Sequence, residues 1–164
     1  VNQKAFLFSN TILHNILYGH PEQKSQFKEV VNISKMVNVH KAIMGLSSGY
    51  HTMIRENGEP LSTGQIRQVS IARAILRDPK VLLLDDPVAG LDADSVEHLV
   101  TAIQALRKNR TILIISNNTK LLEIADKVVV LDRSESRTYV KESSTHRNLL
   151  GHSEFYRKLV GEAK

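Results

Sequence analysis

The sequence contains no cysteine among its 164 residues. This absence excludes disulfide bonds, a thiolate nucleophile and any zinc site built on cysteine, and it is compatible with a reducing compartment. Long hydrophobic runs are absent too. The longest aliphatic runs, such as Val81–Leu84 and Ile112–Ile115, fall far short of the ~20 apolar residues that a membrane-spanning helix needs. The first residue is Val1 and no secretion signal follows it, so the chain can be a piece of a longer protein.

Charge of one sign is in only slight excess, with 22 Lys and Arg against 17 Asp and Glu and a formal net charge of +5. The basic residues are scattered along the chain rather than gathered in a stripe. The excess therefore favours phosphate-bearing partners mildly and does not predict a nucleic-acid surface. The hydrophobic fraction of 41% is close to the average for soluble globular proteins, so we expect a core in one domain or in part of a larger one.

The first half of the sequence carries helical patterns. Apolar residues recur at helical spacing over residues 11–18 and 25–44, which predicts helices there. Ser62 stands three residues before Gln65, the spacing of a capping box, so a further helix should begin at Ser62. Pro79 disfavours helical geometry in the residue before it and cannot donate a backbone hydrogen bond, so this helix should end just before it.

Strand and helix patterns alternate in the second half. Val81–Leu84 is a continuous aliphatic run, typical of a strand covered on both faces. An amphipathic helical pattern over Val96–Leu106 precedes the predicted strand Thr111–Ile115, and a third strand, Val128–Leu131, comes before a hairpin-like segment and a final helix around Phe155–Val160. This alternation predicts an α/β fold with a parallel sheet, helices on both faces and right-handed crossovers. Ligands of such sheets gather at the carboxyl ends of the strands.

Two adjacent carboxylates, Asp85 and Asp86, follow the first predicted strand directly. At the mouth of a buried strand they could hold a hydrated metal ion and its phosphate ligands, one facing the metal and the other the attacking water. The alternative is that they only mark a turn and cap the next helix.

A second candidate is the segment Leu61–Gln65, LSTGQ, at a predicted helix start. Free backbone N–H groups and the positive end of the helix dipole suit an anion such as a terminal phosphate, and the hydroxyl of Ser62 could be a further donor. Plain N-capping explains the same residues equally well.

Several segments in order resemble the ATP-binding domain of ABC transporters of the exporter type, and the similarity extends from Val1 to about residue 160. Gln3–Ile12, QKAFLFSNTI, is similar to the family's Q-loop, and LSTGQ to its LSGGQ signature. Val81–Pro87, VLLLDDP, resembles the Walker B strand with the catalytic position, and Ala89–Asp92, AGLD, resembles the D-loop. The resemblance implies a partial P-loop NTPase (RecA-like) domain, with a helical subdomain over about residues 10–78 and the remaining core over about 79–164.

The resemblance also implies cofactors, partners and roles. In this family two domains pair head to tail around ATP and Mg²⁺, on the cytoplasmic face of a membrane, and join the transmembrane domain of an exporter; no nucleic-acid partner is expected. The implied metal-binding residues are Gln3 and Asp85. The implied nucleotide-binding residues are Gln3, Ser62, Gly64, Gln65 and Asp92, with Asp92 crossing the dimer interface.

The chain departs from the family pattern in ways that bear on catalysis. No GxxxxGK[ST] phosphate loop occurs, so the chain alone should bind ATP poorly, and the strand that the loop follows would be expected beside Thr111–Ile115. Asp86 stands where the family has glutamate, and Asn117 where it has a histidine; these are the two catalytic positions. Thr63 replaces the first signature glycine, which is costly only if the position needs a positive φ.

These departures predict a degenerate site that holds nucleotide longer than it hydrolyses it, as one subunit of a heterodimer would show. Two other functions stay open. One is a non-transport pseudo-ATPase or an ATP-independent interaction fragment of the same superfamily. The other is a DNA-associated ATPase, which the net charge permits but the exporter-like QKAFLFSNTI argues against.

Overall fold

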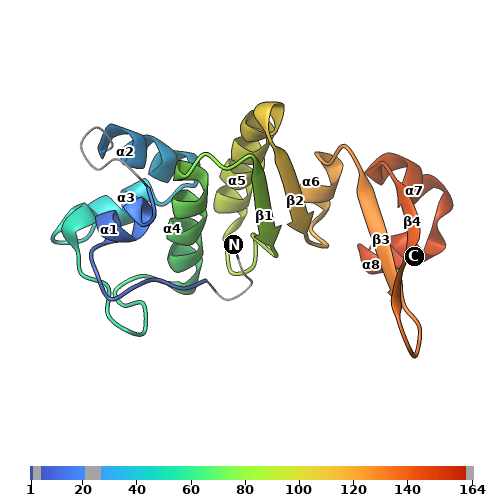
Figure 1. The fold of residues 1–164 in the computed structure, drawn as a ribbon, viewed down its shortest axis with the longest axis horizontal. Helices are drawn as coiled ribbons and strands as arrows, with labels where there is room; N and C mark the ends of the chain where they lie inside the picture. The colour runs from blue at the N-terminus through green and yellow to red at the C-terminus, as the bar shows by residue number, and fades with distance from the viewer. Residues whose placement is uncertain (2–4, 21–26, 162–164) are drawn as a thin grey trace. The chain divides into compact units, whose positions relative to one another are not determined.

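The computed structural model describes residues 1, 5–20 and 27–161 of the chain (Figure 1). They form two compact units, Val1–Ile115 and Ser116–Lys164, and each is described by itself. Within the described ranges, none of the helices has the length and apolar character to span a bilayer. The elements of the first unit are α1 (Ile12–Leu17), α2 (Phe27–Met36), α3 (His40–Met44), η1 (Gly49–His51), α4 (Thr63–Leu76), β1 (Val81–Asp85), α5 (Ala93–Leu106), η2 (Arg107–Asn109) and β2 (Thr111–Ile115).

The N-terminal helices pack around α4, and Figure 1 shows α1 and α2 beside it. The helices predicted over residues 11–18 and 25–44 are confirmed, the second as the two helices α2 and α3. Asn38 lies between them with a left-handed φ of 62°, a conformation that asparagine tolerates better than most residues and that ends a helix.

Helix α4 begins where the capping box predicts. The backbone N–H of Gln65 donates to the hydroxyl of Ser62 at 3.2 Å, and Gln65 Oε1 accepts from the backbone N–H of Ser62 at 2.9 Å. The helix ends at Leu76. Its buried side chains include the polar Arg67 and Gln68 beside the apolar ones, so α4 is enclosed by the unit rather than exposed along a polar face.

Strands β1 and β2 pair in parallel, from Val81 opposite Thr111 to Asp85 opposite Ile115. The parallel arrangement predicted for these two strands is confirmed. On the other edge of β1, the backbone N–H of Asp85 donates to the carbonyl oxygen of Val1 at 3.0 Å. Val1 therefore lies beside the carboxyl end of β1.

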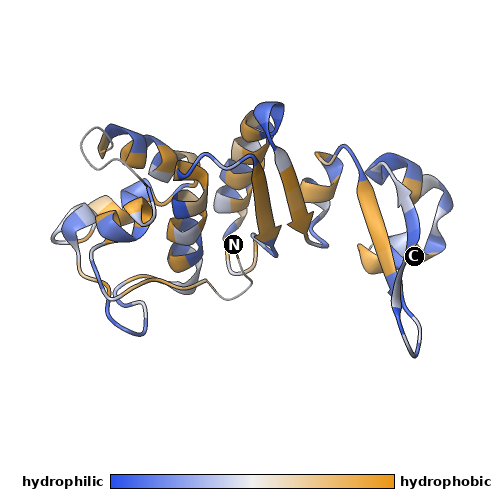
Figure 2. Ribbon diagram, in the orientation of Figure 1, coloured by the Kyte–Doolittle hydropathy of each residue, from blue (hydrophilic) through white to orange (hydrophobic). Residues whose placement is uncertain are grey.

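The two faces of β1 differ in exposure, although Figure 2 shows the strand as hydrophobic along its length. Leu82 and Leu84 are buried, whereas Val81 and Leu83 are 58% and 55% exposed. Successive side chains of a strand point to opposite faces, and the first unit packs against only one of them. The expectation that this strand is covered on both faces is therefore not met by the described residues.

The outer edge of β2 is open in the described part of the chain, where β1 is its one strand partner. Leu113 and Ile115, on the apolar face of β2, are 58% and 64% exposed. Among the described residues, no strand occupies the edge beside Thr111–Ile115, where the strand before the phosphate loop would be expected. An unpaired edge next to an exposed apolar face favours aggregation unless something covers it.

The second unit consists of α6 (Thr119–Glu123), β3 (Val128–Arg133), β4 (Thr138–Ser144), α7 (His146–His152) and α8 (Glu154–Leu159). The predicted third strand is present, but it pairs antiparallel with β4 in a two-stranded sheet of its own. Among the described strands, the predicted parallel sheet therefore consists of β1 and β2, because a short hairpin gives β3 an antiparallel neighbour. The predicted hairpin and final helix are confirmed, whereas α7 was not predicted. The core of this unit is formed by Val128, Val130, Leu149 and Tyr156.

Candidate functional site

The carboxyl end of β1 holds the two adjacent carboxylates. Asp85 is the last residue of the strand, and Asp86 follows with a left-handed φ of 43°. The backbone N–H of Asp86 donates to the carbonyl oxygen of Ile115 at 2.8 Å. Its carbonyl oxygen accepts from Nη1 of Arg67 at 2.8 Å. The backbone of Asp86 is therefore held from β2 on one side and from α4 on the other.

The LSTGQ segment forms the start of α4. Ser62 is the N-cap residue and Thr63 the first helical residue. Thr63 is not among the described residues with a positive φ, so its replacement of a signature glycine carries little backbone strain. The first-turn N–H groups of a helix lack intrahelical partners. Gln65 N–H is used by the cap, as the N-capping alternative predicts, but the Ser62 hydroxyl accepts that bond and keeps its proton for another acceptor.

The AGLD segment lies against this helix start. A Cβ atom built on Gly64 would lie 2.6 Å from the carbonyl oxygen of Gly90, closer than real Cβ contacts. Only a glycine at position 64 therefore permits the observed approach of the two segments.

Asp92 caps α5, the helix that follows the AGLD segment. Its carboxylate accepts from the backbone N–H of Ser95 at 2.8 Å and from the Ser95 hydroxyl at 3.1 Å. The backbone hydrogen bond, followed by the hydroxyl one, holds the pKa of the Asp92 carboxyl below its usual value. The side chain is thus an anion at neutral pH.

The two segments share a hollow of about 340 Å³ on the first unit. Its lining is mainly polar and comes from the loop after α2, from α3, from the start of α4 and from the residues around the start of α5. The lining residues are Asn38, Lys41, Ala42, Ser62, Gly64, Gln65, Gln68, Gly90, Leu91, Asp92, Asp94 and Ser95. The structure therefore brings together four predicted site residues, Ser62, Gly64, Gln65 and Asp92.

A polar network in the wall of this hollow was not predicted from the sequence. Gln68 Nε2 donates to the Ser95 hydroxyl at 3.0 Å, and Asn38 Nδ2 donates to Asp94 at 2.7 Å. Gln68 and Ser95 are 5% and 3% exposed. The only available signal was the presence of polar residues on helix faces that also carry apolar ones, which does not say which partners they meet.

Four predicted site residues are not among those that line this hollow. Asp85 and Asp86 lie at the carboxyl end of β1 instead. Gln3 lies outside the described residues. Asn117 belongs to the second unit, where it is exposed and follows Ser116, whose hydroxyl accepts from the backbone N–H of Asn118 at 3.1 Å. The roles of Gln3 and Asn117 stay predictions.

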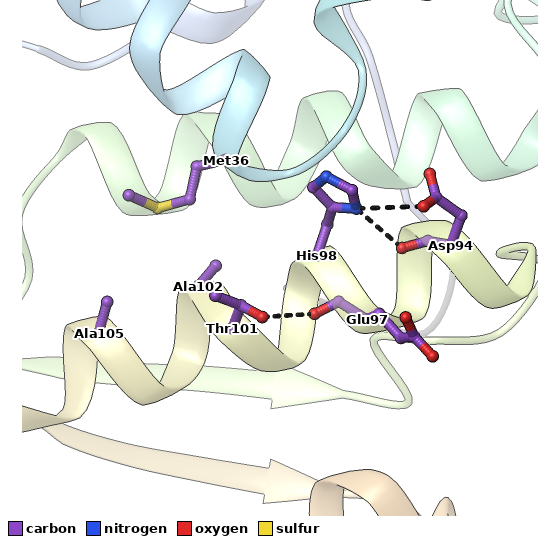
Figure 3. A pocket seen from close by; sticks show the side chains of 7 residues that line it. All are labelled: Met36, Asp94, Glu97, His98, Thr101, Ala102 and Ala105. Carbon is purple, nitrogen blue, oxygen red and sulfur yellow. Dashed lines mark hydrogen bonds and ion pairs between the residues drawn. The ribbon is translucent and has the colours of Figure 1, made fainter.

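Another hollow of about 390 Å³ lies between α2 and α5 (Figure 3). Met36 of α2 faces a stretch of α5 that includes Asp94, His98 and Ala102. His98 Nδ1 lies 3.0 Å from the backbone oxygen of Asp94. In the part of the chain that the structure describes, no three His, Asp or Glu side chains gather as a metal site, so this hollow offers no built cation site.

Two parts of the first unit have the chemistry that ATP and Mg²⁺ require: the start of α4 suits phosphate, and the end of β1 suits the metal ion. The donor set at the start of α4 suits phosphate oxygens, because it combines helix N–H groups with a hydroxyl donor. Asp85 supplies one carboxylate at a strand end, which matches the way Mg²⁺ is bound by one or two carboxylates, waters and phosphates. The chain therefore has residues of the kinds that phosphate and Mg²⁺ binding need.

Comparison with known proteins agrees with this geometry. A protein-family model described as ABC transporter matches residues 1–89. The ABC-type transporter fsqE of Aspergillus fumigatus is 40% identical over 166 residues, which cover 98% of this chain and 13% of that protein. ABC transporter B family member 2 of Dictyostelium discoideum is 40% identical over 160 residues, covering 98% of this chain and 11% of that protein.

A solved structure of a bacterial Atm1-family ABC exporter with ATP bound superimposes with a TM-score of 0.84 at 29% identity, covering 98% of this chain and 27% of the exporter chain. The chain thus spans between 11% and 27% of these proteins. Its fold is that of part of the P-loop NTPase domain of such an exporter. Since the family model matches 89 of the 164 residues, the chain belongs to the ABC transporter family.

Proposed function

We propose that this chain is the part of an ABC exporter's ATP-binding domain that extends from the Q-loop onward. In this proposal it couples ATP binding and hydrolysis at a head-to-tail dimer interface to transport across a membrane. The observation that carries the proposal is the shared hollow, which joins Ser62, Gly64 and Gln65 to Asp92. The likeness to a solved ABC exporter supports it. Residues about 10–78 would form the helical subdomain and about 79–164 the rest of the core.

The nucleotide would be shared between two domains. The hydroxyl of Ser62 and the N–H of Gly64 would donate hydrogen bonds to the γ-phosphate of ATP held by the partner domain, and Asp92 would meet that domain across the interface. In this chain's own site, Asp85 and Gln3 would hold Mg²⁺, which neutralises phosphate charge when it is bound. Asp86 would orient the attacking water and accept its proton.

Hydrolysis in this chain's own site would be slow. The side chain of Asp86 is shorter by one methylene than that of glutamate, so its carboxylate would lie farther from the attacking water. A misplacement of ~1 Å can cost about 10²-fold in rate. Asn117 can hydrogen-bond a phosphate oxygen, but unlike a histidine it cannot become charged near neutral pH. The signature residues would nevertheless complete the partner's site, as in a heterodimer with one degenerate site.

The partners follow from the same assignment. We expect a second ATP-binding domain and the transmembrane domain of an exporter, at the cytoplasmic face of its membrane. The loops near Gln3 and Glu56 would meet the transmembrane domain. No nucleic-acid partner is expected, because the scattered basic residues form no stripe.

The proposal is tested in the full-length protein with its dimer partner, reconstituted in liposomes. We expect ATP-dependent transport and ATPase activity to fall about tenfold or more in Gly64→Asp, which fills the approach to Gly90 and places a negative charge at the phosphate site. Gly151→Asp is the matched control, because a Cβ at Gly151 meets nothing within 4 Å. ATP-independent binding of a partner protein, with no nucleotide effect, would instead support the interaction-fragment alternative.

A further inference from the structure

We propose that Arg67 is a positioning residue that holds the backbone of Asp86 and thereby fixes the direction of the Asp86 carboxylate. The inference rests on the proposed function, in which the start of α4 serves the partner's nucleotide and Asp86 serves this chain's own. Arg67 would then link the two sites through one helix.

The conformation of Asp86 needs support from its surroundings. Its φ of 43° lies in the left-handed region, which residues with a side chain seldom adopt. Such conformations persist where neighbouring groups over-determine them. Here the N–H donates to the carbonyl oxygen of Ile115 at 2.8 Å, and the carbonyl oxygen accepts from Arg67 Nη1 at 2.8 Å and from the backbone N–H of Ala89 at 3.3 Å.

Arg67 is well suited to this role. It is 6% exposed, so its guanidinium is held inside the unit, where a charge-assisted hydrogen bond to a carbonyl is stronger than a neutral one. Because the bond reaches the backbone of Asp86, the carboxylate stays available to a ligand. An arginine with a purely structural role could donate to any nearby carbonyl oxygen. The carbonyl oxygen that Arg67 contacts belongs to Asp86, the residue at the predicted catalytic position.

The position of Arg67 on α4 relates it to the signature residues. Gly64, Arg67 and Gln68 lie at the spacing i, i+3 and i+4, which places them on one helix face. All three contact the segment that runs from Asp86 to Ser95: Gly64 approaches Gly90, Arg67 bonds Asp86, and Gln68 bonds Ser95. One face of α4 therefore holds the whole segment between the catalytic position and the start of α5.

A mechanism of communication follows. A shift of the first turn of α4, when it meets nucleotide in the partner's site, would move Arg67 together with Gly64, since both belong to one rigid helix. The Asp86 carbonyl would follow Arg67. The state of one nucleotide site would thereby change the position of the carboxylate in the other.

The test uses the full-length protein with a dimer partner whose own site cannot hydrolyse ATP. Steady-state hydrolysis is measured over a range of ATP concentrations, so that kcat and KM report on this chain's own site. For Arg67→Met we expect kcat to fall about tenfold with an unchanged KM for ATP, because the carboxylate is misplaced while nucleotide binding is not. Arg67→Lys, which keeps a charged donor, should recover most of the rate. Arg110→Met is the matched control: Arg110 is also largely buried and donates to a backbone carbonyl, that of Leu106, but it lies at the amino end of β2.

A second measurement does not depend on ATPase activity. Hydrogen–deuterium exchange of the peptide spanning residues 86–92 should rise in Arg67→Met and stay unchanged in Arg110→Met, whether or not the protein hydrolyses ATP. It also covers the case in which Arg67→Met folds poorly, because Arg67→Lys should then leave exchange near that of the native protein.

The outcomes separate the two proposals. If the native protein neither binds nor hydrolyses ATP, the proposed function fails, and exchange in residues 86–92 still decides whether Arg67 holds Asp86. If ATP is hydrolysed and Arg67→Met lowers neither kcat nor the protection of this peptide, the positioning role of Arg67 is overturned. Equal losses in Arg67→Met and Arg110→Met would overturn it too, because they would reflect general destabilisation.

Discussion

Gly64 and Gly90 approach so closely that a Cβ atom on Gly64 would lie 2.6 Å from the carbonyl oxygen of Gly90. This contact between two backbones joins the start of α4 to the AGLD segment without any side chain between them. It explains why Gly64, at the second glycine position of the signature, has to be glycine, whereas Thr63 at the first glycine position is an ordinary helical residue.

The first prediction concerns Gly64→Ala. Alanine is favoured over glycine inside a helix by roughly 0.5–1 kcal/mol, but here the new Cβ must displace a backbone carbonyl. We expect the overlap to dominate and the AGLD segment to move away from α4. Hydrogen exchange of residues 89–95 in the full-length protein should increase, and steady-state ATPase activity should fall.

Gly151→Ala is the control for this prediction, since Gly151 lies in α7 and a Cβ there meets nothing within 4 Å. It should leave exchange in residues 89–95 and ATPase activity unchanged. Unaltered exchange in Gly64→Ala would show that the two segments can separate without cost, contrary to the close contact described.

The second prediction concerns the two altered catalytic positions. Asp86→Glu combined with Asn117→His should raise single-turnover hydrolysis in the full assembly about tenfold or more, because a longer carboxylate and a titratable ring are restored together. The rate is measured with nucleotide limiting, so that only the first turnover counts. No gain in rate would remove the argument for a degenerate site.

Features that depend on neighbouring residues in the sequence could be predicted, whereas contacts made by tertiary packing could not. Local signals were sufficient for α4, because Ser62 and Gln65 carry the whole capping box within four residues. They were also sufficient for the parallel pairing of β1 with β2. They could not predict that Asn38, Gln68 and Ser95 meet, because these residues come from three segments that only tertiary packing brings together.

Some residues of the candidate site could be predicted from the sequence and others could not. Family motifs pointed to Ser62, Gly64, Gln65 and Asp92, which the structure gathers around one hollow. Arg67 carried no such signal, because an arginine inside a helical pattern reads as a solvated side chain until its burial is known. The exposed face of β1 also escaped prediction, since an aliphatic strand does not reveal whether covering elements lie within the same chain segment.

The third prediction concerns the polar link at Asn38, whose φ is 62° and whose amide donates to Asp94 at 2.7 Å. Asn38→Gly keeps the backbone conformation and loses only the side-chain bonds, whereas Asn38→Ala adds strain of about 1 kcal/mol or more in the left-handed region. We expect exchange in α2 and α3 to rise slightly in Asn38→Gly and more in Asn38→Ala. The reverse order would mean that backbone strain at this position is negligible.

The fourth prediction uses the ionisation of Asp92. Hydrogen bonds from Ser95 hold the pKa of this carboxyl below its usual value of 3.8. The ionised form is therefore favoured by folding, so its contribution to stability is complete above pH 3.8 and is lost as the pH falls through the lower folded pKa. Protection of the first-turn amides of α5 in the full-length protein, corrected for the intrinsic pH dependence of exchange, should fall over that acidic range.

Two substitutions at Asp92 separate charge from capping. Asp92→Ser keeps a side-chain oxygen that can accept from the N–H of Ser95, so protection of the α5 first turn should persist at neutral pH and lose its dependence on pH. Asp92→Ala removes both the cap and the charge and should lower this protection about fivefold at neutral pH, the usual cost of a lost N-cap. If Asp92→Ala leaves the first turn as protected as in the native protein, the bonds to Ser95 do not stabilise the start of α5. The proposed contact across the dimer interface would then be the one role left for Asp92.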